Sequence, residues 1–290
     1  MKWIDYVAPH SVREAVDLLN EAGDRARILA GGTDLLVQLR VGTHDLDLVV
    51  DGKGIPELNE LSYDPVNGLT IGAAVPCYKI YGDAAVRQAY PGLVDAASLI
   101  GGTQIQGRAS LGGNLCNAAP SGDSIPVMIA LKGVAHIAGP GGTRDVPVEE
   151  FCTFVRQTVL QRGEMLVSLH FPPPVANSGA HYLRFIPRNE MDIAVAGVGV
   201  SVVLDNGNIK EARVALASVA PTPLFVAAAG QAISGKPANE DTVRIASAIA
   251  RDAAKPITDM RGTIEYRTHL CEVLTRRALI KAIERAKENS

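Results

Sequence analysis

Hydrophobic and polar positions follow helical and strand periods along the 290-residue chain. Near its start, Ser11 and Glu14 form a capping box followed by an apolar stripe, which predicts a helix. Short apolar runs at 27–30 and 46–50 predict buried strands, separated by a glycine-containing loop and a second helix. The first 50 residues or so are therefore expected to form a β-α-β unit.

The middle of the chain mixes short strands with helices. Strands are predicted at 69–73, 134–138 and 164–171, and helices at 76–88, 91–100 and 125–131. Three consecutive prolines, Pro172 to Pro174, then interrupt the pattern, so we expect a domain boundary there.

A two-residue period dominates the region that begins at His181. Large apolar residues alternate with glycine and serine from 194 to 204, which predicts a strand. Asn206-Gly207 is a strong hairpin signal, so the next strand, at 210–217, should pair with the first. Helices are predicted at 240–253 and 263–286. The predicted subdomains are 1–55, 56–175 and 176–290.

Composition is consistent with a protein of this size that buries a large core. Hydrophobic residues make up 47% of the chain, and its length suits two or three subdomains better than one core. The formal net charge is -3 with no run of Lys or Arg, which argues against a nucleic-acid partner.

The sequence shows no signal for export, a membrane span or a metal site. Asp5 and the lack of an apolar run argue against a secretory signal, and Pro221 and Pro223 break the longest uncharged segment. The four cysteines are widely spaced without a C-x-x-C, and the histidines are scattered, so no metal or iron–sulfur site is expected on this chain. A cytoplasmic location with reduced thiols is the expectation.

Two glycine-containing loops are the strongest functional signal. One runs from Ala30 to Leu35 and the other from Ser110 to Asn114. Glycine pairs let a backbone approach a ligand, and successive N–H groups beside a helix start bind anions. Neither loop has one of the two common nucleotide-binding spacings. Two such loops predict a long ligand with a central diphosphate, bound mainly by backbone N–H groups.

Polar residues around these loops add candidate contacts. Asn114 and Asn117 can hydrogen-bond phosphate or ribityl oxygens, and Asp123 suits ribose or ribityl hydroxyls. Two structural alternatives remain open. Thr33 and Asp34 also suit capping of the helix after the first loop, and the second loop also reads as a long turn with Asx caps.

These motifs resemble a known family. The chain resembles the FAD-binding medium subunit of the molybdenum hydroxylases, which include xanthine dehydrogenase and carbon monoxide dehydrogenase. Residues 30–36 and 109–123 resemble the two FAD loops of that family. Segments at 192–196, 212–223 and 256–267 resemble parts of its carboxy-terminal domain, so the similarity covers nearly the whole chain.

The resemblance implies an α+β protein. Two α/β subdomains with the FAD-binding fold of the vanillyl-alcohol-oxidase type would bind an extended FAD. An α+β carboxy-terminal domain of the CO dehydrogenase flavoprotein type would close over it.

The same comparison implies roles for particular residues. Leu166 would pack on the flavin ring, and Arg184 aligns with a basic residue that approaches the flavin, although a surface cation is an equal alternative. Ile193 departs from the tyrosine that some relatives have near the ring. The complete set of candidate cofactor residues is Ala30, Gly31, Gly32, Thr33, Asp34, Leu35, Thr103, Gly112, Gly113, Asn114, Asn117, Asp123, Leu166 and Arg184.

The family implies an electron-transfer oxidoreductase subunit. A large subunit would carry the molybdenum cofactor and a small subunit two [2Fe-2S] clusters, in a heterotrimer or a pair of heterotrimers. FAD on this chain would pass electrons to an external acceptor, and no catalytic acid, base or nucleophile is expected. Two alternatives remain: a self-contained FAD-dependent oxidoreductase with its own substrate pocket, and a non-enzymatic module with a structural nucleotide.

Overall fold

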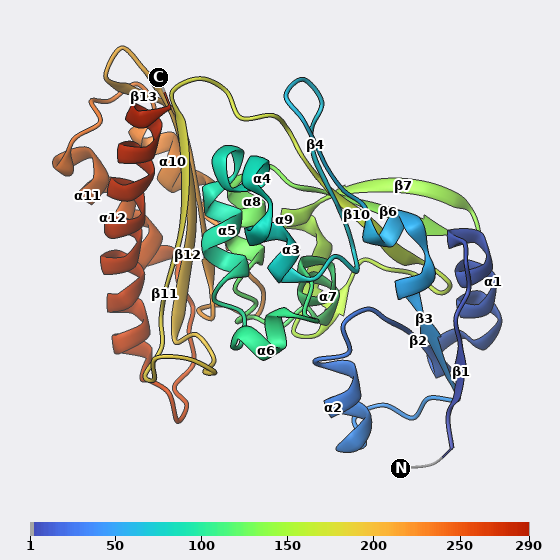
Figure 1. Ribbon diagram of the computed structural model, residues 1–290. Coiled ribbons are helices and arrows are strands. Elements are labelled where there is room, and N and C mark those ends of the chain that lie inside the picture. The colour runs from blue at the N-terminus through green and yellow to red at the C-terminus, as the bar shows by residue number, and fades with distance from the viewer. Residues whose placement is uncertain (1–2, 290) are drawn as a thin grey trace.

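The computed structural model describes residues 3–289, which form three main sheets with helices around them (Figure 1). The first sheet contains three parallel strands in the order β1-β3-β2. Its elements are β1 (Asp5–Val7), α1 (Val12–Ala22), β2 (Ala26–Leu29), α2 (Leu35–Arg40) and β3 (Leu48–Asp51). This confirms the predicted β-α-β unit, to which β1 adds an unpredicted third strand.

The helix α1 begins where the capping box predicts. The backbone N–H of Glu14 donates to Ser11 Oγ at 3.2 Å. The buried Ala15, Val16 and Leu19 then point one face of α1 into the core, so local capping and the apolar stripe agree.

The second sheet is antiparallel, in the order β4-β5-β10-β6-β7. Its strands are β4 (Leu61–Asp64), β5 (Gly68–Gly72), β6 (Val134–Gly139), β7 (Gly142–Pro147) and β10 (Met165–Phe171). The helices of this region are α3 (Cys77–Gly82), α4 (Ala84–Ala89), α5 (Pro91–Ala97), α6 (Thr103–Gln106), α7 (Leu111–Asn117), α8 (Ile125–Ala130) and α9 (Val148–Phe151). A ribbon of β8 (Cys152–Phe154) and β9 (Gln157–Thr158) and 3₁₀ turns at Gly23–Arg25, Gly52–Gly54 and Pro56–Asn59 complete these two regions.

One predicted helix is two helices in the structure. Asp83 is extended (φ -76°, ψ 125°), so it separates α3 from α4. Its Oδ1 accepts the backbone N–H of Val86 at 2.9 Å and caps α4. The expectation of one helix over 76–88 is therefore wrong, because Asp83 favours a cap over a helix interior.

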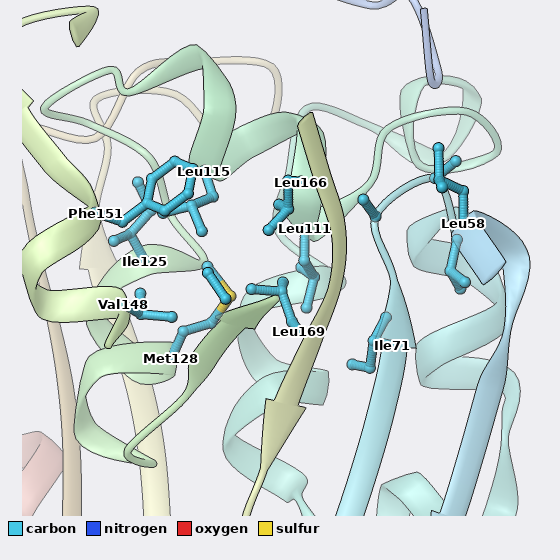
Figure 2. Close-up of a cluster of buried hydrophobic side chains, with 14 of the residues drawn as sticks. Leu58, Ile71, Leu111, Leu115, Ile125, Met128, Val148, Phe151, Leu166 and Leu169 are labelled. Carbon is cyan, nitrogen blue, oxygen red and sulfur yellow. The ribbon is translucent and has the colours of Figure 1, made fainter. Parts of the chain in front are cut away.

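A single buried cluster joins the first two sheets. It includes Leu111 and Leu115 of α7 together with Leu166 and Leu169 of β10 (Figure 2). Val50 of the first sheet belongs to the same cluster. The helix α7, which carries the second glycine pair, is thus held against the central strand of the second sheet.

The third sheet has the order β11-β12-β13-β14 and is antiparallel. Its elements are β11 (Ser178–Phe185), β12 (Ala196–Asp205), β13 (Asn208–Ala217), β14 (Leu224–Phe225), α10 (Ala227–Ile233), α11 (Glu240–Ala253) and α12 (Ile264–Glu288). Asn206 and Gly207 have φ of 49° and 81°, as a tight hairpin between β12 and β13 requires. The long α12 runs along this sheet (Figure 1).

The other face of the third sheet lies against α8 of the second region. A side chain at Gly199 of β12 would overlap the backbone of Val127, and Ser201 Oγ donates to the carbonyl oxygen of Ala130 at 2.7 Å. The chain reaches this sheet through Pro172–Pro174, between β10 and β11. Because the two regions pack so closely, β11 is placed beside the segment that follows α7.

Candidate cofactor site

The two glycine-containing segments lie against each other. A Cβ atom on Gly31 would overlap the carbonyl group of Arg108, just before the second segment, and Arg108 Nε donates to the carbonyl oxygen of Gly31 at 3.3 Å. Gly31 is therefore required by contact with the chain itself. The structure brings together two segments that are far apart in sequence, as a shared ligand would need.

The first segment begins α2 without a side-chain cap. Gly32 has a φ of 80°, which favours glycine, and its carbonyl oxygen accepts the N–H of Leu36. Asp34 is the N-cap residue, but no side-chain cap hydrogen bond forms. Capping thus does not account for Thr33 and Asp34. Leu35 packs beside the small buried cluster on the first sheet, and Ala30 packs beside the main core.

The second segment is a helix start, so the glycine-containing loop predicted from Ser110 to Asn114 and the alternative of a long turn with Asx caps are both wrong. Ser110 is the N-cap of α7, and its Oγ accepts the N–H of Gly113 at 3.0 Å. Gly112, Gly113 and Asn114 therefore lie in the first turns of α7. Glycine is a poor helix former, so the pair hid a helix that capping and core packing stabilise.

The two glycines of α7 are required for different reasons. A Cβ on Gly112 would lie 2.5 Å from the carbonyl oxygen of Ala73, so this glycine permits close backbone packing. A Cβ on Gly113 would meet only Ser110 Oγ, at 3.0 Å. The only protein atom that a Cβ at position 113 would meet is thus a side-chain oxygen and not the backbone, and a bound group as the reason for this glycine stays a prediction.

Asn114 and Asn117 both use their oxygen atoms inside the protein. Asn114 Oδ1 accepts from Ser124 Oγ at 2.7 Å, and Asn117 Oδ1 accepts from Gln38 Nε2 at 2.9 Å. Gln38 belongs to α2, so the second bond joins the two glycine-containing segments. Neither Nδ2 group has a hydrogen-bond partner among residues 3–289, which leaves N–H donors for anionic oxygens.

Asp123, between α7 and α8 of the second region (β4 to β10), forms a buried ion pair with Arg184 of β11 in the third region or domain (β11 to α12). Arg184 Nη1 donates to Asp123 Oδ2 at 2.6 Å, and Tyr182 Oη donates to Asp123 Oδ1 at 2.6 Å. Only 5% of the Arg184 side chain is exposed, so the surface-cation alternative is wrong. Burial raises the pKa of the Asp123 carboxyl, and the Arg184 charge and the Tyr182 hydrogen bond oppose that rise.

The protein partners of Asp123 change its expected role. The sequence predicts contacts from this carboxylate to ribose or ribityl hydroxyls, but each of its oxygens already accepts a protein hydrogen bond. Each carboxylate oxygen keeps a second lone pair, so a cofactor contact stays a prediction.

Two residues near the site, Tyr182 and Arg156, are not among those predicted from the sequence. Tyr182 could have been found, because a period of two places it on the same strand face as Arg184. Arg156 has no such signal, since it lies at the tip of the β8–β9 ribbon with φ of 58°. Desolvation raises the pKa of the Asp34 carboxyl, although part of that residue is accessible, and the charge of Arg156 opposes the rise.

Three other residues of interest are not joined to these contacts. Leu166 lies within the buried cluster and is only 3% exposed (Figure 2). Thr103 is the first residue of α6, and Ile193 is exposed just before β12. Their proximity to a flavin stays a prediction.

Other features do not suggest a second centre within residues 3–289. That part of the chain contains no group of three or more His, Cys, Asp or Glu side chains placed to hold a metal. None of its helices combines the length and the apolar character needed to cross a membrane. A cavity of about 540 Å³ between the second and third regions contains none of the predicted cofactor residues.

Comparison with known families agrees with the predicted identity. Residues 2–174 match the FAD binding domain in molybdopterin dehydrogenase, and residues 181–282 match the CO dehydrogenase flavoprotein C-terminal domain. These matches confirm the predicted fold class and FAD as the cofactor of this family of chains.

Relatives match over nearly their whole length. The chain is 33% identical to the xanthine dehydrogenase FAD-binding subunit of Escherichia coli O157:H7, covering 97% of this chain and 98% of the relative. It is 30% identical to the carbon monoxide dehydrogenase medium chain of Hydrogenophaga pseudoflava, covering 95% of each.

Solved structures show the same architecture. A chain of reconstituted CO dehydrogenase from Oligotropha carboxidovorans superposes with a TM-score of 0.94 at 29% identity, over 98% of this chain and 99% of that chain. Quinoline 2-oxidoreductase from Pseudomonas putida 86 gives 0.90 at 27% identity, over 99% of each chain. With both domains matched in order, this chain belongs to the FAD-binding subunits of the molybdenum hydroxylases, an oxidoreductase family that includes the xanthine and carbon monoxide dehydrogenases.

Proposed function

We propose that this chain is the electron-transfer flavoprotein subunit of a molybdenum-containing hydroxylase or dehydrogenase. It would take electrons from [2Fe-2S] clusters of a small partner subunit and pass them to an external acceptor. A large partner subunit would hold the molybdenum cofactor and act on the substrate. The observation that carries the proposal is the match over at least 95% of the length of proteins named as subunits or medium chains.

The residues at the predicted site fit FAD. A Cβ at position 113 would meet no protein atom within 4 Å except Ser110 Oγ, and the Nδ2 groups of Asn114 and Asn117 are available donors. Arg184 Nε is buried without a partner among the described residues, as expected for a donor that meets a bound group. These features lie on α7, which carries the second glycine pair, and on β11, and the first glycine-containing segment contacts Arg108 just before α7. An extended cofactor matches this spread better than a small anion does.

FAD, when bound, supplies the redox chemistry, since flavins exchange electrons both singly and in pairs. The chain itself binds and orients the cofactor. The segment 30–35 and Gly112 to Asn114 would hold the diphosphate region. Asp123 and Arg184 would add polar contacts, and Thr103, Asn117 and Leu166 would border the cofactor. No residue of this chain needs to act as a catalytic acid or base.

The chief alternative is a self-contained flavin oxidoreductase. Such an enzyme needs a substrate pocket with an acid or base near the flavin. The buried carboxylate of Asp123 is the candidate acid or base near the site, but it is already hydrogen-bonded to Arg184 and Tyr182. The paired state favours a role in positioning over proton transfer to a substrate.

The four unbridged cysteines support a cytoplasmic location within the same proposal.

Purification of the tagged chain from its native cells tests this function. We expect the tagged chain to bring down two partner subunits with molybdenum and iron, and the complex to reduce its flavin when given substrate. The isolated chain should contain FAD, but no small-molecule substrate should reduce that FAD when the partner subunits are absent. Flavin reduction by a substrate on the isolated chain, with no metal-bearing partner, would support the self-contained enzyme instead.

A further inference from the structure

Tyr182 is a buried polar residue that the proposed function leaves without a role. It lies on β11 in the third domain and is 1% exposed. Its hydroxyl donates to Asp123 Oδ1, on the segment between α7 and α8 of the second region. A buried hydroxyl bonded to a buried carboxylate of another domain constrains how those domains meet, because breaking the bond would leave both groups unsatisfied.

The chain also makes room for this hydroxyl. Gly197 lies in β12, where it pairs with Arg184 of β11. A Cβ at position 197 would lie 2.6 Å from Tyr182 Oη, whereas the next atoms are 3.4 Å or more away. Glycine weakens a strand interior, so its presence here is best explained by the space that the hydroxyl occupies.

The carboxylate that Tyr182 contacts sits between two groups of polar contacts. On one side, Arg184 Nη1 donates to Asp123 Oδ2, while Arg184 Nε stays buried without a partner among residues 3–289. On the other side, the neighbouring Ser124 donates to Asn114 of α7. Asp123 and Ser124 together therefore connect β11 with the second glycine-containing segment.

We infer that Tyr182 is a positioning residue for FAD. The Tyr182 hydroxyl holds the Asp123 carboxylate, and that carboxylate in turn keeps Arg184 beside the second glycine-containing segment. The inference rests on the proposed function, because FAD is the group that Arg184 Nε would meet. On this inference, the third domain completes the cofactor site partly through the hydrogen bond between Tyr182 and Asp123, in which the Tyr182 hydroxyl makes no contact with the cofactor.

The arrangement has a pH signature. Burial raises the pKa of Asp123, and the Arg184 charge and the Tyr182 hydrogen bond act against that rise. These are the two charged or titratable groups that act on Asp123 within the described part of the chain. Removing the hydroxyl moves the pKa of Asp123 further upward. A protonated Asp123 no longer pairs with Arg184 as an ion, so FAD affinity should fall at a higher pH than in the wild type.

The test is FAD titration of the full chain by fluorescence across a range of pH. Tyr182→Phe should bind FAD about tenfold more weakly at neutral pH, as expected for a lost hydrogen bond to a charged group. The acid-side midpoint of its affinity profile should also move to higher pH. Tyr90→Phe is the matched control, since Tyr90 is equally buried but donates to the carbonyl oxygen of Pro172, and it should keep wild-type affinity.

Gly197→Ala provides a second route that leaves every hydroxyl present. Its Cβ should displace the Tyr182 hydroxyl and weaken FAD binding, whereas the same change in a Tyr182→Phe background should add no further loss. Wild-type affinity and an unshifted pH profile in a folded Tyr182→Phe, or fully additive losses in the double variant, would overturn the inference. A folded wild-type chain that binds no FAD at any pH would instead overturn the proposed function.

Discussion

At the scale of single residues, the two neighbouring glycines of α7 are needed for different physical reasons. A Cβ on Gly112 would meet the backbone of Ala73, whereas a Cβ on Gly113 would meet only the side-chain oxygen of Ser110. The sequence presents them as one glycine pair, because the contact with Ala73 forms only when α7 packs near the end of β5. Sequence similarity could identify the pair as a cofactor motif, but only the packing separates Gly112, which the backbone of Ala73 requires, from Gly113, which we propose faces the cofactor.

The two glycines should therefore fail differently. Gly113→Val is expected to abolish FAD retention while the third domain stays folded, because a branched side chain would occupy space reserved for the cofactor. Gly112→Ala is expected to lower the free energy of unfolding by about 1–3 kcal/mol through overpacking. Flavin content per chain and urea unfolding measure the two effects. Full flavin content in Gly113→Val would show that the assignment of this segment is wrong.

At the scale of elements, the sequence predicts best the helices and strands that have a clear hydrophobic period of their own. The strand period of 194–204 and the stripe after Ser11 appear as β12 and α1. β7 was missed because its outward-facing, polar residues give no apolar alternation. α7 was missed because its glycines oppose helix formation, and it depends on a cap and on β10. Contacts distant in sequence decide such elements.

The contact between the two glycine-containing segments can be tested at the same scale. Gly31→Ala should push Ala30–Leu35 away from Arg108, so both FAD affinity and the free energy of unfolding should fall, the latter by about 2 kcal/mol. Gly82→Ala at the end of α3 is the control, because nothing lies within 4 Å of its added Cβ. Thermal unfolding and FAD titration report both effects. Equal behaviour of the two variants would contradict the close approach.

At the scale of the whole molecule, a charged cluster fastens the third domain to the second region. Asp95 of α5 accepts two hydrogen bonds from Arg285 of α12, at 2.5 and 2.9 Å, and one from His181 of β11 at 2.6 Å. No single-element pattern announces this cluster, since its members come from three elements far apart in sequence. Burial would raise the pKa of Asp95, but the hydrogen bonds from His181 and Arg285 lower it overall.

This cluster should make stability depend on acid pH. The pKa of Asp95 is lower in the folded state than in the unfolded state, where it is about 3.9. The stabilisation is therefore complete above the unfolded pKa and is lost as the pH falls through the folded pKa. Asp95→Asn should lose about 3 kcal/mol at neutral pH, because Arg285, whose side chain is only 19% exposed, stays without its counter-charge. Its unfolding free energy should fall less steeply below about pH 4 than that of the wild type. Parallel pH profiles in urea unfolding would exclude this role.

The absorbance spectrum of the purified chain, with the released cofactor identified by mass, tests the proposed FAD site most directly. We expect flavin absorbance, FAD as the released molecule and a stoichiometry of one per chain. A folded chain that carries no flavin, even after incubation with FAD, would contradict the central claim that the two glycine-containing segments and the third domain together form an FAD site.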